Sequence, residues 1–242
     1  MWIWVLCGLI AGAFALLPVL VNSSRSSLKL LLSGKREVLI VFAHPDDETM
    51  FFLPVISLLN VVGVPFRLLC LSTGDYDGLG LTRVKEFNSV SRYLKAASGD
   101  ILDLPRLRDG PHLWDPSDVS NAVSDFLNSH PKIEGIITFD GYGVSGHPNH
   151  KSVYEGVRVT KTRRDLIKLS LVSVPLWRKY LPVLDMALIY VFSSFDFLCA
   201  VNWKDPFQSA RAMQLYKSQN VWFRKLFSVF SRYSYVNDFV RI

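Results

Sequence analysis

The chain has little cysteine and no repeated segment, and these absences narrow the classes of protein it can belong to. Only three of its 242 residues are cysteine, scattered at Cys7, Cys70 and Cys199. Three separated cysteines do not form a disulfide framework, so they indicate small core or lipid-facing residues in a reducing compartment. Internal repeats and low-complexity tracts are also missing, which argues against a repeat architecture. The length suits one sizeable domain with its own core.

Charge is missing from the start of the chain. Residues 1–21, MWIWVLCGLIAGAFALLPVLV, carry no charged side chain and are long enough to cross a bilayer. They lack the basic start of an ordinary signal peptide, so a retained anchor is favoured over a cleaved signal, which stays the alternative. Basic residues near a membrane end tend to remain cytosolic, and those before the first acid are Arg25, Lys29, Lys35 and Arg36. We therefore expect a single-pass anchor with the body of the protein in the cytosol.

Acidic residues are scarce in two later segments. Residues 158–179 contain seven basic residues and one acid, and residues 211–242 contain six and one, within a net charge of +6. No nucleic-acid motif accompanies this charge, so no nucleic-acid partner is predicted. With an anchor present, contact with anionic membrane lipid is the simpler interpretation; a merely solvated basic face is the alternative.

Between residues 37 and 174, apolar runs typical of strands alternate with helix-like segments. The expected strands are 37–43, 66–72, 99–105, 133–139 and 167–174, and the expected helices are 49–63, 81–98, 115–130 and 148–164. This alternation predicts an α/β, Rossmann-like domain over 37–242, with a mostly parallel sheet and helices on both faces. Residues 22–36 would form a basic juxtamembrane linker. Ligands of such sheets bind at the carboxyl ends of the strands.

The apolar segment 181–201 is long enough to span a bilayer as well. Asp185 and Asp196 within it argue against a second span. We interpret it as a core strand plus a hairpin or helix, and whether its apolar side contacts the membrane stays open.

Two short motifs follow strands of the predicted sheet. AHPDDE, residues 43–48, follows the first strand, and GHPNH, residues 146–150, follows the strand that ends near residue 140. Proline suits the first turn of a helix, where residues three apart share a face, so the motifs pair His44 with Asp47 and His147 with His150. Imidazole and carboxylate together suit zinc or a similar divalent ion, with the remaining Asp and His free for proton transfer and charge stabilisation. The alternative is a pair of ordinary helix caps.

The same two motifs, about a hundred residues apart, resemble the PIG-L / LmbE-like family of zinc-dependent de-N-acetylases. The resemblance covers about residues 37–225 and includes STGDYDGLGLTRVKEF, residues 72–87. The anchor, GVSGHPNH and the ending AMQLYKSQNVWFRKLFSVFSRY, residues 212–233, are most similar to the eukaryotic branch that acts on N-acetylglucosaminyl-phosphatidylinositol (GlcNAc-PI).

The resemblance implies a set of site residues. Asp46 would be the general base, and His147 would support the oxyanion and could protonate the leaving amine. Arg83 is a candidate for the substrate phosphate, and its alternative is a surface helix charge or a salt bridge to Glu86. Asp75 is a candidate for the wall of the cleft, and its alternative is a role in a turn alone. Some bacterial relatives place a tyrosine two residues before the catalytic histidine, where this chain has Ser145. The implied ligands of Zn²⁺ or another divalent metal are His44, Asp47 and His150.

These expectations combine into a membrane-anchored hydrolase that removes acetyl from GlcNAc-PI, the second step of GPI-anchor biosynthesis. The endoplasmic reticulum membrane is the location implied by the family. One alternative is an amide hydrolase that acts on another GlcNAc conjugate, and another is a metal-binding scaffold of the same fold without turnover. The sequence does not indicate protein partners or oligomeric state, and His112 and His130 receive no role.

Overall fold

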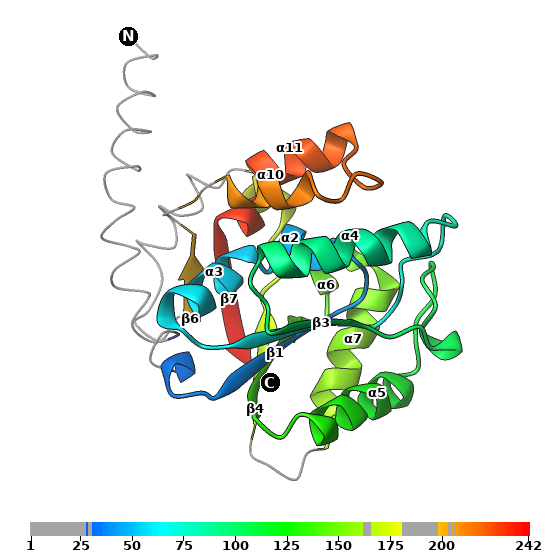
Figure 1. Cartoon of the computed structure of the whole chain (residues 1–242), viewed down its shortest axis with the longest axis vertical. Helices are drawn as coiled ribbons and strands as arrows, with labels where there is room; N and C mark the ends of the chain where they lie inside the picture. Colours follow the sequence, from blue (N-terminus) through cyan, green and yellow to red (C-terminus); the bar gives the residue numbers. More distant parts are fainter. Residues whose placement is uncertain (1–27, 29–30, 162–165, 181–197, 203–204, 206) are drawn as a thin grey trace.

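The computed structural model describes residues 28, 31–161, 166–180, 198–202, 205 and 207–242. These residues form a mixed α/β fold around one seven-stranded sheet, whose strand order is β3-β2-β1-β4-β5-β7-β6 (Figure 1). The strands are β1 (Glu37–Phe42), β2 (Phe66–Cys70), β3 (Ser98–Ile101), β4 (Ile133–Phe139), β5 (Ile167–Leu171), β6 (Leu198–Val201) and β7 (Val236–Arg241). The first five pair in parallel, so the predicted mostly parallel sheet is confirmed.

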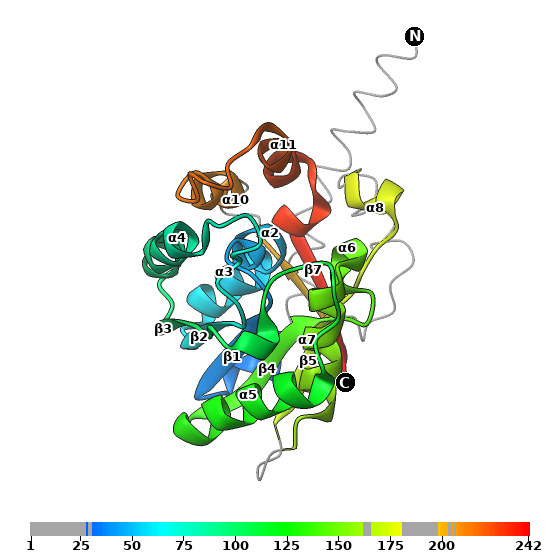
Figure 2. The same cartoon turned by 90° about the vertical axis from the view of Figure 1, so that its right-hand side faces the viewer.

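Helices lie on both sides of the sheet, as expected. Figures 1 and 2 show α3 (Leu53–Val62) and α4 (Gly80–Tyr93) on one side, with α5 (Pro116–Ser129) and α7 (Pro148–Val159) on the other. Coverage of both faces explains why all six residues of β1 are buried and why its sequence is almost continuously apolar. The shorter helices are α2 (Asp47–Phe51), α6 (Gly143–Gly146), α8 (Leu176–Tyr180), α10 (Gln208–Met213), α11 (Trp222–Phe230), and the 3₁₀ turns Pro105–Leu107 and Arg232–Ser234.

Three expected helices have clearly different bounds. The single helix expected over 49–63 is divided, because α2 ends at Phe51 and α3 begins at Leu53 with Pro54 in its first turn. Proline lacks the N–H that a helix interior needs, so it starts a new helix here. The helix expected over 81–98 ends at Tyr93, and β3 begins at Ser98. The helix expected over 148–164 ends at Val159.

Strand β7 was not predicted, whereas β6 lies at the end of segment 181–201, where a core strand was expected. β7 pairs antiparallel with both β5 and β6, and its sequence, VNDFVR, has buried polar side chains at Asn237 and Asp238. Asn237 explains why: its amide donates to the carbonyl of Phe51 at 2.7 Å and accepts from the N–H of Val55 at 3.2 Å. A polar side chain in a core strand thus fixes the break between α2 and α3, which periodicity cannot reveal.

The order of the strands places a crevice at a defined point. From β1 the chain continues to β2 and β3 on one side and then crosses to β4 on the other side of β1. In such sheets the carboxyl ends of the strands diverge at this switch and leave a ligand crevice. The AHPDDE and GHPNH motifs follow β1 and β4, the two strands that flank it.

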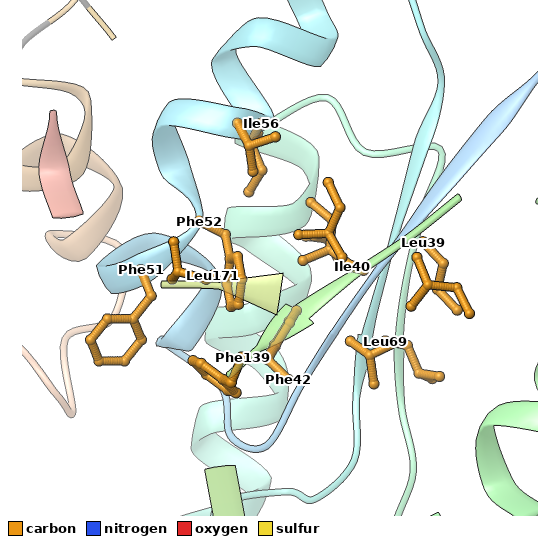
Figure 3. Close-up of a cluster of buried hydrophobic side chains, with 14 of the residues drawn as sticks. Leu39, Ile40, Phe42, Phe51, Phe52, Ile56, Leu69, Phe139 and Leu171 are labelled. Atoms are coloured by element: carbon orange, nitrogen blue, oxygen red, sulfur yellow. The ribbon is translucent and has the colours of Figure 1, made fainter. Parts of the chain in front are cut away.

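The hydrophobic core reaches the same crevice. Figure 3 shows Phe42, Phe52 and Phe139 gathered between β1, β4 and the start of α3. The ring centroids of Phe52 and Phe139 lie 5.1 Å apart. The ring of Phe139 also stacks on His150 at a centroid distance of 4.2 Å and an interplanar angle of 2°. Core packing therefore fixes the orientation of one motif histidine.

The expected anchor, residues 1–21, lies outside the described residues, as does most of segment 181–201. In the part of the chain that the structure describes, no helix combines the length and apolarity needed to cross a bilayer. Within the expected linker, Leu28 and Leu32 are buried in the core cluster with exposed fractions of 0% and 1%. These two leucines therefore pack with the domain that follows them.

Candidate active site

The loop after β1 is held by its own carboxylates. The Oδ2 atom of Asp47 accepts the backbone N–H groups of His44 at 2.9 Å and Ala43 at 3.2 Å. Asp46, which lies between His44 and Asp47 in the chain, adopts φ = 101°, a left-handed conformation that is costly for a residue other than glycine. This conformation turns the backbone sharply enough for His44, Asp46 and Asp47 all to line one cavity.

The loop after β4 is held by Asp140. Its carboxylate accepts the N–H of Gly143 at 3.0 Å and both the N–H and the hydroxyl of Ser173 at 2.6 Å. Gly143 has φ = 69°, and a Cβ there would lie 2.6 Å from the Cβ of His150, so only glycine fits. The carbonyl of Gly143 lies 3.0 Å from Nδ1 of His150.

The two loops bring the predicted ligands together. Oδ1 of Asp47 lies 3.3 Å from Nε2 of His150, and its Oδ2 lies 3.7 Å from Nδ1 of His44. His147 is adjacent, because His44, His147 and His150 can each offer a ring nitrogen with all three atoms within 4.8 Å of one another. All four side chains face the cavity, which has a volume of about 510 Å³.

These residues fit a divalent metal such as zinc. Ligand atoms bound to one tetrahedral zinc at about 2.0–2.1 Å lie about 3.4 Å apart, close to the separations of Asp47 from both histidines. Each histidine also has a partner on its other nitrogen, as metal-bound histidines usually do. Nε2 of His44 lies 3.0 Å from the carboxylate of Asp109, and Nδ1 of His150 faces the Gly143 carbonyl.

His147 differs from the other two histidines. It precedes α7, and its Nδ1 accepts the N–H of Asn149 at 3.2 Å, which caps the helix. In the neutral ring the proton then sits on Nε2, where it can be donated. Burial and the neighbouring His44 and His150 lower the pKa of His147 to about 4.

The pKa values of the two adjacent aspartates, Asp46 and Asp47, are shifted in opposite directions. Burial opposes ionisation of both. For Asp47 the charges and hydrogen bonds of His150 and His44 outweigh burial and hold the pKa below its usual range. For Asp46 burial prevails and raises the pKa, although the guanidinium groups of Arg224 and Arg83 oppose it. One carboxylate is thus held ionised between imidazoles, and the other is suited to accept a proton.

Arg83 lies beside Asp46, the expected general base. Its guanidinium donates to the carbonyls of Gly74 at 2.8 Å and Pro45 at 2.5 Å, and lies 3.5 Å from Oδ1 of Asp46. Gly74 is necessary for this approach, since a Cβ there would be 2.5 Å from the guanidinium carbon. Arg83 also lines the cavity, where a substrate could reach it. Its contact with the substrate phosphate stays a prediction.

Asp75 lies in the loop before α4, and its carboxylate accepts the N–H of Gly80, the first residue of that helix, at 2.6 Å. Its neighbours Tyr76 and Asp77 line the cavity, and Asp75 is not among the lining residues of the described chain. Its predicted role in substrate binding stays a prediction. Ser145, which stands where some relatives have tyrosine, does line the cavity.

Sequence reasoning missed four residues of the site. Asn149 was within reach, because it lies inside GHPNH; its Oδ1 contacts Nε2 of His44 at 2.9 Å. Glu48, the last residue of AHPDDE, is fully buried and accepts from the hydroxyl of Tyr216 at 2.7 Å, and burial raises its pKa to about 8. Asp109 and Arg224 are distant in sequence from their partners His44 and Asp46, and no local pattern marks them. Arg224 lies 3.2 Å from Oδ2 of Asp46.

Comparison with known sequences agrees with the resemblance that the two motifs indicated. The family described as PIG-L, GlcNAc-PI de-N-acetylase, matches residues 39–161. The chain is 36% identical to a probable N-acetylglucosaminyl-phosphatidylinositol de-N-acetylase of Schizosaccharomyces pombe, covering 96% of each chain. It is 37% identical to the N-acetylglucosaminyl-phosphatidylinositol de-N-acetylase of Bos taurus, covering 86% of this chain and 84% of the bovine one.

Solved structures share the fold. The N,N′-diacetylchitobiose deacetylase of Pyrococcus horikoshii superposes with a TM-score of 0.58 at 18% identity, covering 90% of this chain and 89% of that one. The zinc-inhibited form of a teicoplanin deacetylase gives a TM-score of 0.57 at 13% identity, with 85% and 98% coverage. Sequence similarity over nearly the whole chain, together with a buried His/Asp cluster at the switch point of the sheet, leads to one conclusion. The chain belongs to the GlcNAc-PI de-N-acetylase family.

Proposed function

We propose that this protein removes the acetyl group from the glucosamine of GlcNAc-PI, releasing acetate and a free amine in the second step of GPI-anchor biosynthesis. The observation that carries the proposal is the meeting of two motifs in one cavity. There, three histidines and an ionised aspartate surround a point beside a second aspartate of raised pKa. Relatives that span most of the chain bear the name of this activity.

We assign the metal to His44, Asp47 and His150. Two donor sets are possible, since the three histidines also cluster closely enough to hold an ion. The set with Asp47 is preferred because this carboxylate lies between both other ligands and because Nδ1 of His147 already accepts a backbone N–H. A divalent ion held here, such as Zn²⁺, supplies Lewis-acid chemistry that polarises the amide carbonyl and makes water more acidic.

The chain's own groups then divide the proton chemistry. Asp46 accepts the proton of the attacking water as the C–O bond forms at the amide carbon. His147 donates a hydrogen bond from Nε2 to the developing oxyanion. When the C–N bond breaks, the proton reaches the leaving nitrogen from Asp46 directly or through His147. Arg83 and Arg224 hold Asp46 in place, and Arg83 is our candidate for the substrate phosphate.

Purified full-length protein should deacetylate GlcNAc-PI in vesicles and, more slowly or at higher concentration, a soluble GlcNAc-inositol phosphate. Removal of metal by a chelator should abolish both activities, and added Zn²⁺ should restore them. Hydrolysis of other GlcNAc conjugates but not of the inositol-linked ones would indicate a different amide hydrolase. Metal binding without any turnover would indicate a non-catalytic scaffold.

We also propose that the protein is a single-pass protein of the endoplasmic reticulum membrane, with residues 37–242 in the cytosol. Residues 22–36 would connect the membrane to this domain, against which Leu28 and Leu32 pack. The uncharged segment 1–21 and its basic flank support this proposal. In microsomes, the protein should resist carbonate extraction, and an N-glycosylation site added at the C-terminus should remain unmodified. Release by carbonate, or modification of that site, would contradict the anchor or its orientation respectively.

A further inference from the structure

Large apolar side chains project outward from α11. Four of them, Trp222, Leu226, Val229 and Phe230, recur at the spacing of one helix face, and Phe223 lies beside them. Trp222 is 73% exposed, Phe223 and Phe230 are each 54% exposed, and Leu226 and Val229 are 48% and 36% exposed. An exposed contiguous patch of this kind marks an interaction site in a folded protein.

The neighbouring α8 extends the patch. Leu176, Trp177 and Tyr180 are 71%, 52% and 43% exposed. The ring of Tyr180 meets that of Phe227 edge-on, with centroids 6.4 Å apart, which joins the two helices. We call this surface the apolar rim; its members are Leu176, Trp177, Tyr180, Trp222, Phe223, Leu226, Val229 and Phe230.

The apolar rim borders the catalytic cavity. Tyr180 and Phe223 of the rim line that cavity, as do Phe227 and Arg224 of α11. Figure 2 shows α11 and α8 on the side of the molecule that the carboxyl ends of β1 and β4 face. Whatever covers the rim therefore lies directly at the mouth of the site.

The charges of both helices are of one sign. Neither α8 nor α11 contains an acidic residue. Of their basic residues, Lys225 is exposed and Arg178 partly so, whereas Lys179 is buried and Arg224 pairs with Asp46 in the cavity. Tryptophan and other aromatic residues mixed with basic ones are typical of helices that lie at the surface of a bilayer. Basic groups near an anionic surface add electrostatic attraction to it.

We propose that the apolar rim docks on the surface of an anionic lipid bilayer and holds the mouth of the cavity at headgroup level. The sugar of a lipid-linked substrate can then enter the cavity while its acyl chains stay in the membrane. The benefit for catalysis rests on the proposed function, but the docking itself does not.

Full-length protein can be tested in phosphatidylcholine vesicles with and without phosphatidylserine. In a background with alanine at Cys7 and Cys199, an environment-sensitive fluorophore is attached at Leu226→Cys or, as control, at Val159→Cys. Val159 is 44% exposed and ends α7, the helix whose first turn carries His150. Lipids brominated on their acyl chains should quench the probe at position 226, more strongly with phosphatidylserine, and leave position 159 unchanged. Equal quenching at both positions, or none, would overturn the proposal.

A kinetic test separates docking from chemistry. Phe230→Asp and Val159→Asp are matched, because each residue ends its helix and is about half exposed. Phe230→Asp should act roughly tenfold more slowly on substrate embedded in vesicles, since burying a charge beside lipid is costly. Its rate on a soluble analogue should equal that of the unaltered protein, and Val159→Asp should be normal on both.

The other outcomes are also decisive. An equal loss by Phe230→Asp on soluble and embedded substrate would contradict docking. A loss in native microsomes but not in pure lipid vesicles would mean that a protein partner covers the rim. If the unaltered protein cleaved neither substrate, the proposed function would fail, while the quenching measurement would still decide the docking proposal.

Discussion

In the floor of the cavity, which we define as the loops that follow β1 and β4, polar side chains are buried and partnered, whereas the apolar rim exposes large nonpolar ones. Asp46, Asp47 and His150 are at most 4% exposed, while Trp222 is 73% exposed. The floor resembles a preorganised site, whose groups keep their geometry without reorganisation during the reaction. The rim resembles a surface completed by something outside the chain. This difference predicts that changes in the floor affect chemistry on every substrate, and changes in the rim affect only access from a membrane.

The largest effects should come from the two adjacent aspartates of the floor. Asp47→Asn and His150→Ala should lose both metal and activity, because each removes a ligand. Asp46→Asn should retain the metal, while turnover of a soluble analogue falls by roughly 10²–10⁴-fold, the loss expected for a general base. Metal content and turnover are measured on the same preparations, with Asp77→Asn, a cavity-wall change, as control. Equal release of metal from Asp46→Asn and Asp47→Asn would reverse the assigned roles.

His147 distinguishes the two possible donor sets. His147→Asn keeps a side-chain oxygen that can cap α7 but removes the imidazole. If His147 is an oxyanion donor, turnover should fall by roughly 10²–10³-fold with the metal retained. Loss of metal comparable with that of Asp47→Asn would instead show that the three histidines hold it.

Asp109, the partner of His44, tests whether residues behind the metal ligands contribute to metal binding. Asp109→Asn removes the carboxylate charge 3.0 Å from Nε2 of His44 and should weaken metal binding by roughly 10–100-fold. The metal dissociation constant is measured by competition with a chelator, and Asp103→Asn, on an exposed stretch of the same loop, is the control. An unchanged constant would mean that Asp109 does not support the metal site.

The comparison also explains how far the sequence could predict this molecule. The floor was predictable because its key groups lie in two short motifs after strongly apolar strands, so local spacing and the parallel sheet together place them at one point. All five residues of the motifs with an assigned role, His44, Asp46, Asp47, His147 and His150, line the cavity. The rest of the site depends on residues that only the folded chain brings near.

Asp109 and Arg224 show why the remainder was not predictable. Asp109 lies in a loop between a short strand and α5, and Arg224 belongs to a basic segment for which only contact with anionic lipid was expected and no residue received a catalytic role. Both act through contacts with residues more than sixty positions away. The same limit applied to β7, because its buried Asn237 and Asp238 interrupt the apolar pattern of a strand, and the partners of Asn237, Phe51 and Val55, are distant in sequence.

Arg83 lines the cavity beside Asp46, and the effect expected there is the smallest. Arg83→Lys keeps the charge but cannot reproduce both bonds to the carbonyls of Gly74 and Pro45. Since hydrogen bonds of a charged group are worth about 1.5–3 kcal/mol, a poorly held Asp46 should lower kcat by roughly tenfold on a phosphate-free GlcNAc-inositol. If Arg83 also binds phosphate, kcat/KM should fall further on the phosphodiester substrate alone. Arg92→Lys, on an outer face of α4, should alter neither. Equal losses on the two substrates would contradict the phosphate contact, and no loss on the phosphate-free one would contradict the positioning of Asp46.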